Sequence, residues 1–390
     1  MIKLKKVLSD FNFDNKRVIL RCDLNVPITN GIIEDDTRII ESLKTIKYLI
    51  DKNAKVIILS HLGRVKTEED KKDNSLYPVY LRLRDLLGDN VCFSKYTSGN
   101  KLKELVNTLR TGEILLVENT RFEDIEGKKE SSCDLELSKY WASLGDIFVN
   151  DAYGVCHRSH ASNVGISKFL PSCLGLLVEE EIEKTDGIIK ENTSPYILLM
   201  GGKKISDKTL VIESLIEKCD YILLGGGMCF TFLASLVINV GMSIVDKDNI
   251  PFCKEILSKY KDKIILPVDV KLKSEEIKDI DKLTNEDIAY DIGPKTIELF
   301  KKYLSTAHRV VANGPMGVFE EKEFTNGTRE LYNYLSQNSI KTLIGGGDSI
   351  SAINTLHINK NFYHISTGGG ATLEYIAQGT LPAIEAIEDK

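Results

Sequence analysis

The chain has 390 residues, and its 51 lysines and arginines against 57 aspartates and glutamates give a net charge of −6. Hydrophobic residues make up 42% and charged residues 28%, which is ordinary for a globular protein and too apolar for a disordered one. The negative charge argues against general affinity for nucleic acid or an anionic membrane, so an anion has to meet a local basic cluster. At about 150 residues per domain, the length favours two domains.

Eight cysteines are scattered along the chain, with no C-x-x-C pair to suggest zinc or a redox dithiol. We interpret them as reduced core residues. The first ten residues are basic but lack the apolar segment of a secretory signal, so we expect a cytoplasmic protein.

Short, β-branched apolar runs alternate with segments of helical period, a pattern typical of parallel sheets covered by helices. In the first half, strands are predicted at Arg17–Leu20, Lys55–Ser60, Glu113–Val117 and Asp146–Asn150. In the second half, they are predicted at Tyr196–Met200, Tyr221–Leu224, Lys263–Pro267, Arg309–Ala312, Lys341–Ile344 and Tyr363–Ser366. We expect an α/β protein with two sheets rather than one large sheet.

The segment between these two groups of strands has the pattern of a connecting helix. A helical pattern runs from Leu174 to about Lys190, after Pro171 and before Pro195. A helix bracketed by prolines suits a connector that belongs partly to both domains.

Tyr221–Val245 contains no charged residue and is long enough to raise the question of a membrane span. Gly225, Gly226 and Gly227 interrupt it where a strand would turn into a helix. A buried strand, a turn and a buried helix explain the stretch better.

Basic side chains follow the predicted strands of the first half, where open parallel sheets bind ligands. They and their polar neighbours are Arg21, Asp23, Asn25, His61, Arg64, Arg121, Asp151, His157, Arg158 and His160. Any single arginine is best explained by a surface ion pair, but arginines at several strand ends indicate a small, multiply anionic ligand. The histidine spacings predict no metal site. Two charged stretches, Lys66–Asn74 and Asp124–Ser132, are interpreted as solvated loops.

Glycines follow the predicted strands of the second half. They are Gly201 and Gly202, Gly225–Gly227, Gly345–Gly347 and Gly368–Gly370. Glycine allows close approach to the backbone, and helix N-termini favour phosphate, so the four groups together predict a nucleotide or phosphate site. Gly202–Thr209 resembles a P-loop, but Asp207 occupies the second glycine position, and Gly225–Phe230 lacks the third glycine of a dinucleotide fold.

Two carboxylates accompany these glycines. Asp348 suits a metal ion held mainly through phosphates, or the N-cap of the next helix, and both interpretations stay open. Glu320, after Gly314–Gly317, suits acceptance of ribose hydroxyls.

Ordered motifs along the chain resemble those of the phosphoglycerate kinase family. They are RCDLNVP (Arg21–Pro27), EDDTRI (Glu34–Ile39), SHLGR (Ser60–Arg64), LRLRDLLG (Leu81–Gly88), ENTRF (Glu118–Phe122), SLGDIFVNDAYGVCHRSHAS (Ser143–Ser162), GGKKISDK (Gly201–Lys208), LLGGGM (Leu223–Met228), DIGPKT (Asp291–Thr296), NGPMGVFE (Asn313–Glu320), GGGDS (Gly345–Ser349) and STGGGATLE (Ser366–Glu374).

This resemblance implies two Rossmann-like three-layer domains with parallel sheets flanking a cleft, joined by a helix. It implies a 3-phosphoglycerate domain at 1–172, a connecting helix at 173–191, a nucleotide domain at 192–375 and a segment at 376–390 that returns to the first domain. The implied activity is reversible phosphoryl transfer between 1,3-bisphosphoglycerate with ADP and 3-phosphoglycerate with ATP, with Mg²⁺ on the nucleotide. The implied partners are these small molecules alone, and the implied state is a monomer.

The resemblance also implies the site residues. Substrate binding is expected at Asp23, Asn25, Arg38, His61, Arg64, Arg121 and Arg158. Nucleotide binding is expected at Lys208, Gly225, Gly226, Gly293, Asn313, Pro315, Glu320, Gly346, Gly347, Asp348 and Ser349, with Asp348 on the metal. Arg38, Lys204 and Lys208 are the expected catalytic residues, because the transfer needs positioning and charge neutralisation rather than a general base. The expected cleft would then have to close.

A few residues leave alternatives open. Lys203 stands where the family usually has a small residue, and Ala312 where it usually has tryptophan. The extra cation is compatible with tighter phosphate binding, with a lowered pKa of its neighbour Lys204, or with a side chain in solvent. Cys22 and Cys156 adjoin implied substrate residues, so they are either sites of inhibitory modification or small core residues.

Two other classes of protein fit parts of this pattern. A non-catalytic nucleotide-binding protein would keep the same fold, but the intact Arg38, Lys208 and Asp348 count against it. An NAD-linked dehydrogenase is disfavoured by the missing glycine fingerprint.

Overall fold

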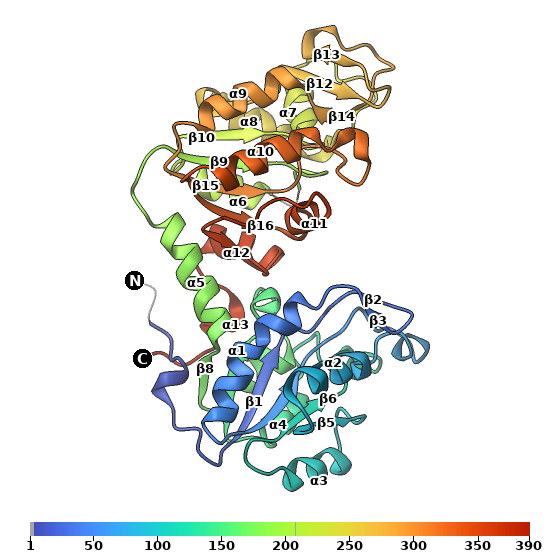
Figure 1. Ribbon diagram of the computed structural model, residues 1–390, viewed down its shortest axis with the longest axis vertical. Helices are drawn as coiled ribbons and strands as arrows, with labels where there is room; N and C mark the ends of the chain where they lie inside the picture. The colour runs from blue at the N-terminus through green and yellow to red at the C-terminus, as the bar shows by residue number, and fades with distance from the viewer. Residues whose placement is uncertain (1–3, 207) are drawn as a thin grey trace. The chain divides into compact units, whose positions relative to one another are not determined.

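The computed structural model describes residues 4–206 and 208–390. The chain forms two compact units (Figure 1): unit 1 extends to Ile182 and includes Thr380–Lys390, and unit 2 is Glu183–Gly379. Each unit contains a six-stranded sheet in which every pairing is parallel. The prediction of an α/β protein with two parallel sheets is confirmed.

The sheet of unit 1 has the strand order β5-β6-β4-β1-β7-β8. Its strands are β1 (Arg17–Cys22), β4 (Lys55–Leu59), β5 (Val91–Ser94), β6 (Ile114–Val117), β7 (Ile147–Asp151) and β8 (Ser172–Leu174). The helices are α1 (Thr37–Asp51), α2 (Tyr77–Leu87), α3 (Asn100–Thr108) and α4 (Leu135–Ala142), and a hairpin joins β2 (Ile28–Thr29) to β3 (Ile32–Ile33). Val18, Ile19 and Leu20 of β1 are all fully buried, so both faces of the sheet are covered.

The sheet of unit 2 has the order β11-β10-β9-β15-β16-β17. Its strands are β9 (Tyr196–Met200), β10 (Tyr221–Leu224), β11 (Ile264–Ile265), β15 (Arg309–Asn313), β16 (Lys341–Gly345) and β17 (His364–Ile365). When the strands are numbered in chain order, the arrangement is the doubly wound order 3-2-1-4-5-6. The strand order reverses between β9 and β15. Ligands of such sheets bind at that point, outside the carboxyl ends of the strands.

Helices cover both faces of this second sheet. Leu198 packs in a core with α6 (Thr209–Leu215), α7 (Cys229–Ser235), α8 (Ile250–Tyr260) and α12 (Gly370–Gln378). The alternate residue Ile197 packs in a second core with α9 (Pro294–Leu304), α10 (Asn326–Gln337) and α11 (Gly347–Thr355). A small antiparallel sheet of β12 (Asp269–Leu272), β13 (Ile277–Asp279) and β14 (Ala289–Ile292) completes the unit (Figure 1).

Every strand predicted from the sequence lies in one of the two six-stranded sheets. The edge strands β5 and β8 were not predicted, because each is short and lacks a run of β-branched residues. The prediction that the connecting helix starts at Leu174 is wrong, since Leu174 pairs in β8 with Asn150, and α5 comprises Leu176–Ile189.

The uncharged stretch Tyr221–Val245 folds as the strand β10, a glycine turn and the buried helix α7, as predicted. Across residues 4–206 and 208–390, we find no helix that has both the length and the apolar surface to span a membrane.

The connecting helix α5 contributes to both units. Leu176 packs against the core of unit 1, and Ile188 belongs to a core of unit 2, so the division of the chain falls inside this helix. The C-terminal segment with α13 (Pro382–Glu385) packs on unit 1, where the backbone N of Ala383 donates to the oxygen of Cys156 at 3.0 Å. It begins at Thr380, later than expected, because α12 belongs to unit 2.

Thiol accessibility gives a test of this packing. Six cysteines are buried, including Cys22 and Cys156, whose thiol pKa values are raised by burial, whereas Cys92 is exposed and Cys133 half-buried. The interpretation of all eight as core residues is therefore wrong for Cys92. We expect iodoacetamide at neutral pH to modify Cys92 first and to leave Cys22 and Cys156 intact until the protein unfolds, as read by peptide mass spectrometry. Early modification of either buried thiol would contradict the fold of unit 1.

Candidate active site

A connected polar group lies at the carboxyl edge of the unit 1 sheet. Asp23 follows β1, and its Oδ2 lies 3.0 Å from Nη1 of Arg38 in the first turn of α1. The same Nη1 donates to the backbone oxygen of Asn25 at 3.1 Å, and Oδ1 of Asn25 accepts from the backbone N of Gly63 at 2.8 Å. The contacts of Asp23, Asn25 and Arg38 therefore fix the direction of the Arg38 guanidinium.

His61 follows β4 and is buried beside this group. Its Nδ1 lies 3.9 Å from Oδ1 of Asp23 and 3.4 Å from Nη2 of Arg21. Burial, and then the positive charges of the arginines around it, hold the pKa of His61 well below its usual value. The imidazole is therefore neutral near pH 7 and offers hydrogen bonding rather than charge.

The remaining arginines predicted for this site are held in different ways. Nη1 of Arg121, after β6, donates to Oγ of Ser131 at 2.6 Å, while its buried Nε has no partner among the residues that the structure describes. Arg64 is exposed and lines, with Arg121, a pocket of about 770 Å³. Arg158 is exposed, with Nε 3.1 Å from Nε2 of His157.

These arginines act on a common space. Arg38, Arg121 and Arg158 each lower the pKa of His61 through their charges, so all three lie within electrostatic reach of one imidazole. Converging guanidinium groups match the oxygens of carboxylates and phosphates. The arrangement suits a small ligand with several negative charges.

Arg21, which the sequence grouped with these residues, is instead part of a buried support. It is fully buried, and its Nε donates to Oγ of Ser162 at 2.8 Å. Ser162 donates in turn to the fully buried carboxylate of Glu130, from its backbone N at 2.9 Å and from Oγ at 2.5 Å. Burial lowers the pKa of Arg21 and raises that of Glu130, and the charge of each partner opposes the shift of the other.

Glu130 corrects an interpretation of the sequence. It lies in Asp124–Ser132, which its charges suggested to be a solvated loop, yet its backbone oxygen accepts from the N of Ala161 at 2.9 Å and its side chain is fully enclosed. Nothing in the charge pattern distinguishes Glu130 from its exposed neighbours. Its role comes from contacts with a distant segment, above all with Ser162, 32 residues further along the chain.

His160 completes this buried layer. Its Nδ1 lies 3.8 Å from Oε1 of Glu130, and burial, followed by the charges of Arg121 and Arg21, lowers the pKa of His160 to about 2. This histidine is therefore also neutral in the folded protein.

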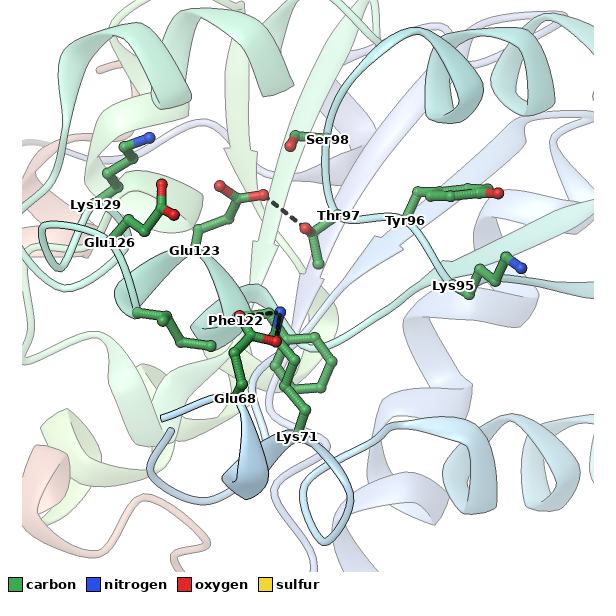
Figure 2. Close-up of a pocket in the computed structure, with 11 residues that line it drawn as sticks. Glu68, Lys71, Lys95, Tyr96, Thr97, Ser98, Phe122, Glu123, Glu126 and Lys129 are labelled. Atoms are coloured by element: carbon green, nitrogen blue, oxygen red, sulfur yellow. Dashed lines mark hydrogen bonds and ion pairs between the residues drawn. The ribbon is translucent and has the colours of Figure 1, made fainter. Parts of the chain in front are cut away.

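A separate pocket of unit 1, shown in Figure 2, has a different character. Its lining carries three lysines and three glutamates, among them Lys71 and Glu68, whose Nζ and Oε2 lie 2.9 Å apart. Oγ1 of Thr97 donates to Oε1 of Glu123 at 2.6 Å across it. It includes none of the predicted site residues, and its balanced charges do not favour an anion.

The second part of the site is a pocket of about 710 Å³ in unit 2. Four of the predicted nucleotide residues line it: Gly226, Pro315, Glu320 and Asp348. Apolar side chains that the sequence did not single out form its walls: Phe230, Met242, Ile244, Tyr290, Val318 and Phe319. An apolar pocket with a few polar groups is typical of sites for flat organic ligands.

The floor of this pocket is built from turns that pack together where the strand order of the sheet reverses. The backbone N of Gly202, after β9, donates to the oxygen of Pro315, after β15, at 2.7 Å. The backbone N of Gly226, after β10, donates to the oxygen of Met316 at 3.1 Å. Gly226 has a φ of +59°, and a Cβ there would lie 2.6 Å from the N of Gly202, so a side chain would force these turns apart.

Asn313 and Gly346 form a polar recess at the ends of β15 and β16. The side chain of Asn313 is buried, and its Nδ2 has no partner within the described chain. Gly346 has a φ of +90°, and a Cβ there would lie only 2.6 Å from this Nδ2. An amide donor left open beside a bare glycine is suited to an oxygen of a phosphate.

Ser349 and Asp348 occupy the first turn of α11. Oγ of Ser349 is buried and accepts from the backbone N of Gly314 at 2.7 Å, which fixes the turn after β15. Asp348 makes no side-chain cap, because Gly346 is the N-cap residue, so the N-cap interpretation of Asp348 is wrong. Its exposed carboxylate lines the pocket instead.

Mg²⁺ bound with a nucleotide fits these residues. The ion typically takes one or two carboxylates together with substrate phosphates. Asp348 supplies one carboxylate to the lining of the pocket, and nowhere in residues 4–206 and 208–390 do three or more His, Cys, Asp or Glu side chains gather as a metal site of their own.

Other predicted residues lie around the pocket rather than in its lining. Gly225 packs against Met316, and Gly293 is the N-cap residue of α9. Lys208 is buried, with Nζ 3.2 Å from the position of a Cβ on Gly202, whereas Lys204 is exposed. Gly347 has open space around its Cα, and Asp207, which replaces a P-loop glycine, lies outside the described residues.

An arginine-lined anion site on one doubly wound unit and an apolar pocket with a phosphate recess on the other define a phosphotransferase that uses a nucleotide and a small anionic acceptor. A model of the family described as "Phosphoglycerate kinase" matches residues 8–379 of the chain.

Similar proteins extend this match over the whole chain. Phosphoglycerate kinase of Macrococcus caseolyticus is 48% identical over 395 residues, covering 99% of this chain and 100% of the relative, and that of Fusobacterium nucleatum is 48% identical over 398 residues with the same coverage. The solved structures of phosphoglycerate kinase from Coxiella burnetii and Pyrococcus horikoshii are each 34% identical, with TM-scores of 0.85 and 0.87. They cover 98% and 97% of this chain, and 98% of each solved chain is matched.

The chain belongs to the phosphoglycerate kinase family. It is an ATP:3-phospho-D-glycerate 1-phosphotransferase of glycolysis and gluconeogenesis, and its substrates are 3-phosphoglycerate or 1,3-bisphosphoglycerate with ATP or ADP and Mg²⁺.

The buried support predicts a stability effect at Glu130. Glu130→Ala leaves Arg21 buried without its counter-charge, so we expect unit 1 to lose about 3–5 kcal/mol of unfolding free energy. Urea unfolding followed by the fluorescence of Trp141 measures this, because the single tryptophan is buried in unit 1. Glu126→Ala, at an exposed position of the same loop, is the control and should change stability by less than about 0.5 kcal/mol. Equal behaviour of the two variants would contradict the support.

The low pKa of His160 predicts a pH dependence. Above pH 6.5 the imidazole is neutral in both folded and unfolded protein and contributes nothing. Below pH 6.5 the unfolded chain binds a proton that the folded chain refuses, so the unfolding free energy falls by about 1.4 kcal/mol per pH unit.

The variant His160→Gln has no imidazole to protonate, so its unfolding free energy should not show this loss below pH 6.5. Between pH 7.0 and 5.5 the original protein should lose about 1 kcal/mol more than the variant in urea unfolding followed by Trp141 fluorescence. Parallel pH profiles for the two proteins would show that His160 binds its proton equally in the folded and unfolded states, which would contradict the lowered pKa.

Proposed function

We propose that unit 1 holds 3-phosphoglycerate or its acyl phosphate and that unit 2 holds the nucleotide with its metal. The substrate residues are Asp23, Asn25, Arg38, His61, Arg64, Arg121 and Arg158. The arginines neutralise the phosphate and carboxylate, and His61 donates a hydrogen bond without adding charge. The contacts of Arg38 with Asp23 and Asn25 carry this proposal, since they aim a cation from the first turn of α1 at the shared space.

In unit 2 we propose that the apolar walls receive the base and that the glycine turns receive the phosphates. The nucleotide residues are Lys208, Gly225, Gly226, Gly293, Asn313, Pro315, Glu320, Gly346, Gly347, Asp348 and Ser349. Asn313 donates its open amide to a phosphate oxygen, Ser349 holds the Gly314 turn, and Asp348 holds the metal. Gly225 and Gly293 act through the packing of turns rather than by direct contact.

The proposed chemistry rests on charge. The acceptor in one direction is a carboxylate and in the other a nucleoside diphosphate, so both nucleophiles are already anionic and no general base is required. Arg38, Lys204 and Lys208 are proposed to stabilise the charge on the transferred phosphoryl group. Bound Mg²⁺ supplies further neutralisation of the phosphate oxygens. Closure of a cleft during this transfer stays a prediction of the sequence.

We also propose the cytoplasm as the location of the protein. The basic N-terminal residues without an apolar segment support it. The two compact units are likewise proposed as functional units, with the substrate on the first and the nucleotide on the second.

A coupled assay tests the proposed residues. ATP consumption with 3-phosphoglycerate, read as NADH loss through glyceraldehyde-3-phosphate dehydrogenase, should require both substrates and Mg²⁺. Arg38→Ala and Lys208→Ala each remove a cation that stabilises the transferring phosphoryl group, so each should lower kcat by about 100-fold or more. Lys302→Ala, at an exposed position of α9, is the control and should retain full activity.

Two results would overturn parts of this assignment. Near-normal kcat in both variants would remove Arg38 and Lys208 from the transfer. Folded protein that binds MgADP without turnover would instead support the non-catalytic alternative, with Lys203 and Ala312 as its marks.

A further inference from the structure

The charges around the nucleotide pocket are unequal. Among its described lining residues, one side chain is cationic, that of Lys203, while four are carboxylates: Asp291, Glu320, Glu321 and Asp348. A nucleoside diphosphate or triphosphate brings several more negative charges. Lys204 and Lys208 are not in the lining, so within the lining Lys203 alone offsets the exposed carboxylates that oppose the binding of such an anion.

The four carboxylates differ in how far their charge is exposed to a ligand. Asp291 is buried and accepts backbone N–H bonds from Gly327 at 2.8 Å and from Ile292 at 2.9 Å, so its oxygens are engaged by the protein. Glu320, Glu321 and Asp348 are exposed to the space that a ligand enters. The unbalanced charge at the pocket is therefore that of three carboxylates.

The backbone around Lys203 is held between the turns that form the pocket floor. A Cβ on Gly227 would lie 2.7 Å from the oxygen and 3.3 Å from the Cα of Lys203, so the two turns are in direct contact. The backbone N of Met228 donates to the oxygen of Gly202 at 3.2 Å, which ties the residue before Lys203 to the start of α7. The backbone position from which the Lys203 side chain extends is thus set by packed turns.

The ammonium group itself is not engaged. Lys203 is exposed, and its side chain forms no hydrogen bond or ion pair within the parts of the chain that the structure describes. A lysine on a flexible stem that lines the nucleotide pocket can reach a phosphate without breaking an existing contact. Of the three possibilities that the sequence left open, phosphate binding is the one that these observations favour.

We propose that Lys203 binds the phosphate chain of the nucleotide and makes nucleotide binding less dependent on Mg²⁺. This inference rests on the proposed placement of the nucleotide in unit 2. The ammonium and the metal neutralise the same oxygens, so Lys203 contributes most when the metal is absent. A chain with a small residue at this position would rely on the metal more strongly.

Isothermal titration calorimetry of the full chain tests the proposal. ADP and adenosine are titrated with excess EDTA and again with excess Mg²⁺, into the original protein, Lys203→Ala, Lys203→Arg and Lys302→Ala. For Lys203→Ala we expect Kd to rise about 10-fold for metal-free ADP and about 3-fold for MgADP, from the loss of one charge-assisted contact. Adenosine should bind unchanged.

The controls separate charge from structure. Lys203→Arg keeps the cation and should remain within about 3-fold of the original protein, and Lys302→Ala removes an equal charge far along the sequence, on α9, without effect. A variant that merely disturbs the turns would weaken adenosine as much as ADP, and this result would overturn the proposal. So would an unchanged Kd for metal-free ADP in Lys203→Ala.

The outcome is independent of turnover. If the original protein turns over and Lys203→Ala binds ADP normally, the inference fails while the proposed function stands. If the original protein shows no turnover but the Kd pattern appears, the proposed transfer residues fail while Lys203 keeps its role.

Discussion

Each large sheet of this chain runs all its strands in one direction, and this constraint decides where chemistry can be placed. In unit 1, the residues after β1, β4 and β6 meet at a single edge, which brings Asp23, His61 and Arg121 to one space although the sequence separates them widely. In unit 2, the turns after β9 and β15 lie side by side, where the strand order reverses. Parallel strands also need both faces covered, so the same topology that builds the two edges demands the buried cores around them.

The two edges handle negative charge by different physical means. Unit 1 uses guanidinium groups, and such a concentration of cations near a buried imidazole is tolerable only with counter-charges beneath it. Glu130 supplies one to the buried Arg21 through Ser162, and His61 and His160 avoid adding charge by staying neutral. Unit 2 combines lysines with backbone and amide dipoles, and the dipoles carry no net charge and need no counter-ion. The floor of the unit 2 pocket is therefore lined by glycine turns, whereas the edge of the unit 1 sheet carries arginines.

The sequence predicts those features that depend on local pattern. Apolar runs such as YILLM mark the central strands, because a strand buried on both faces must be continuously apolar, and glycines mark the turns where backbones meet. Short edge strands such as β8 escape this logic, since three residues carry too little pattern. In the site, motif residues such as Asp23 and Asn313 are visible in the sequence, whereas Glu130 and Met242 gain their roles from contacts with distant segments. The absence of charge in Tyr221–Val245 is the one sequence signal for the apolar wall of the pocket, and this pattern indicates a buried core before it indicates a pocket.

The distribution of carboxylates explains why a cation beside the nucleotide recess has consequences that one beside the arginine cluster would not have. In unit 1, Asp23 and Asp124 are paired with Arg38 and Arg121, and the exposed Arg64 and Arg158 leave a surplus of positive charge at this edge. In unit 2, the exposed carboxylates of Asp348, Glu320 and Glu321 line the pocket, and Lys203 is the one cation among its described lining residues. Binding of a polyphosphate there must be coupled to a cation. Mg²⁺ is a soluble cation whose supply varies, whereas Lys203 is fixed to the chain by the contact of its backbone with Gly227. A fixed charge shifts the balance toward binding at low metal concentration, while the transfer itself still needs the stronger neutralisation that a divalent ion provides.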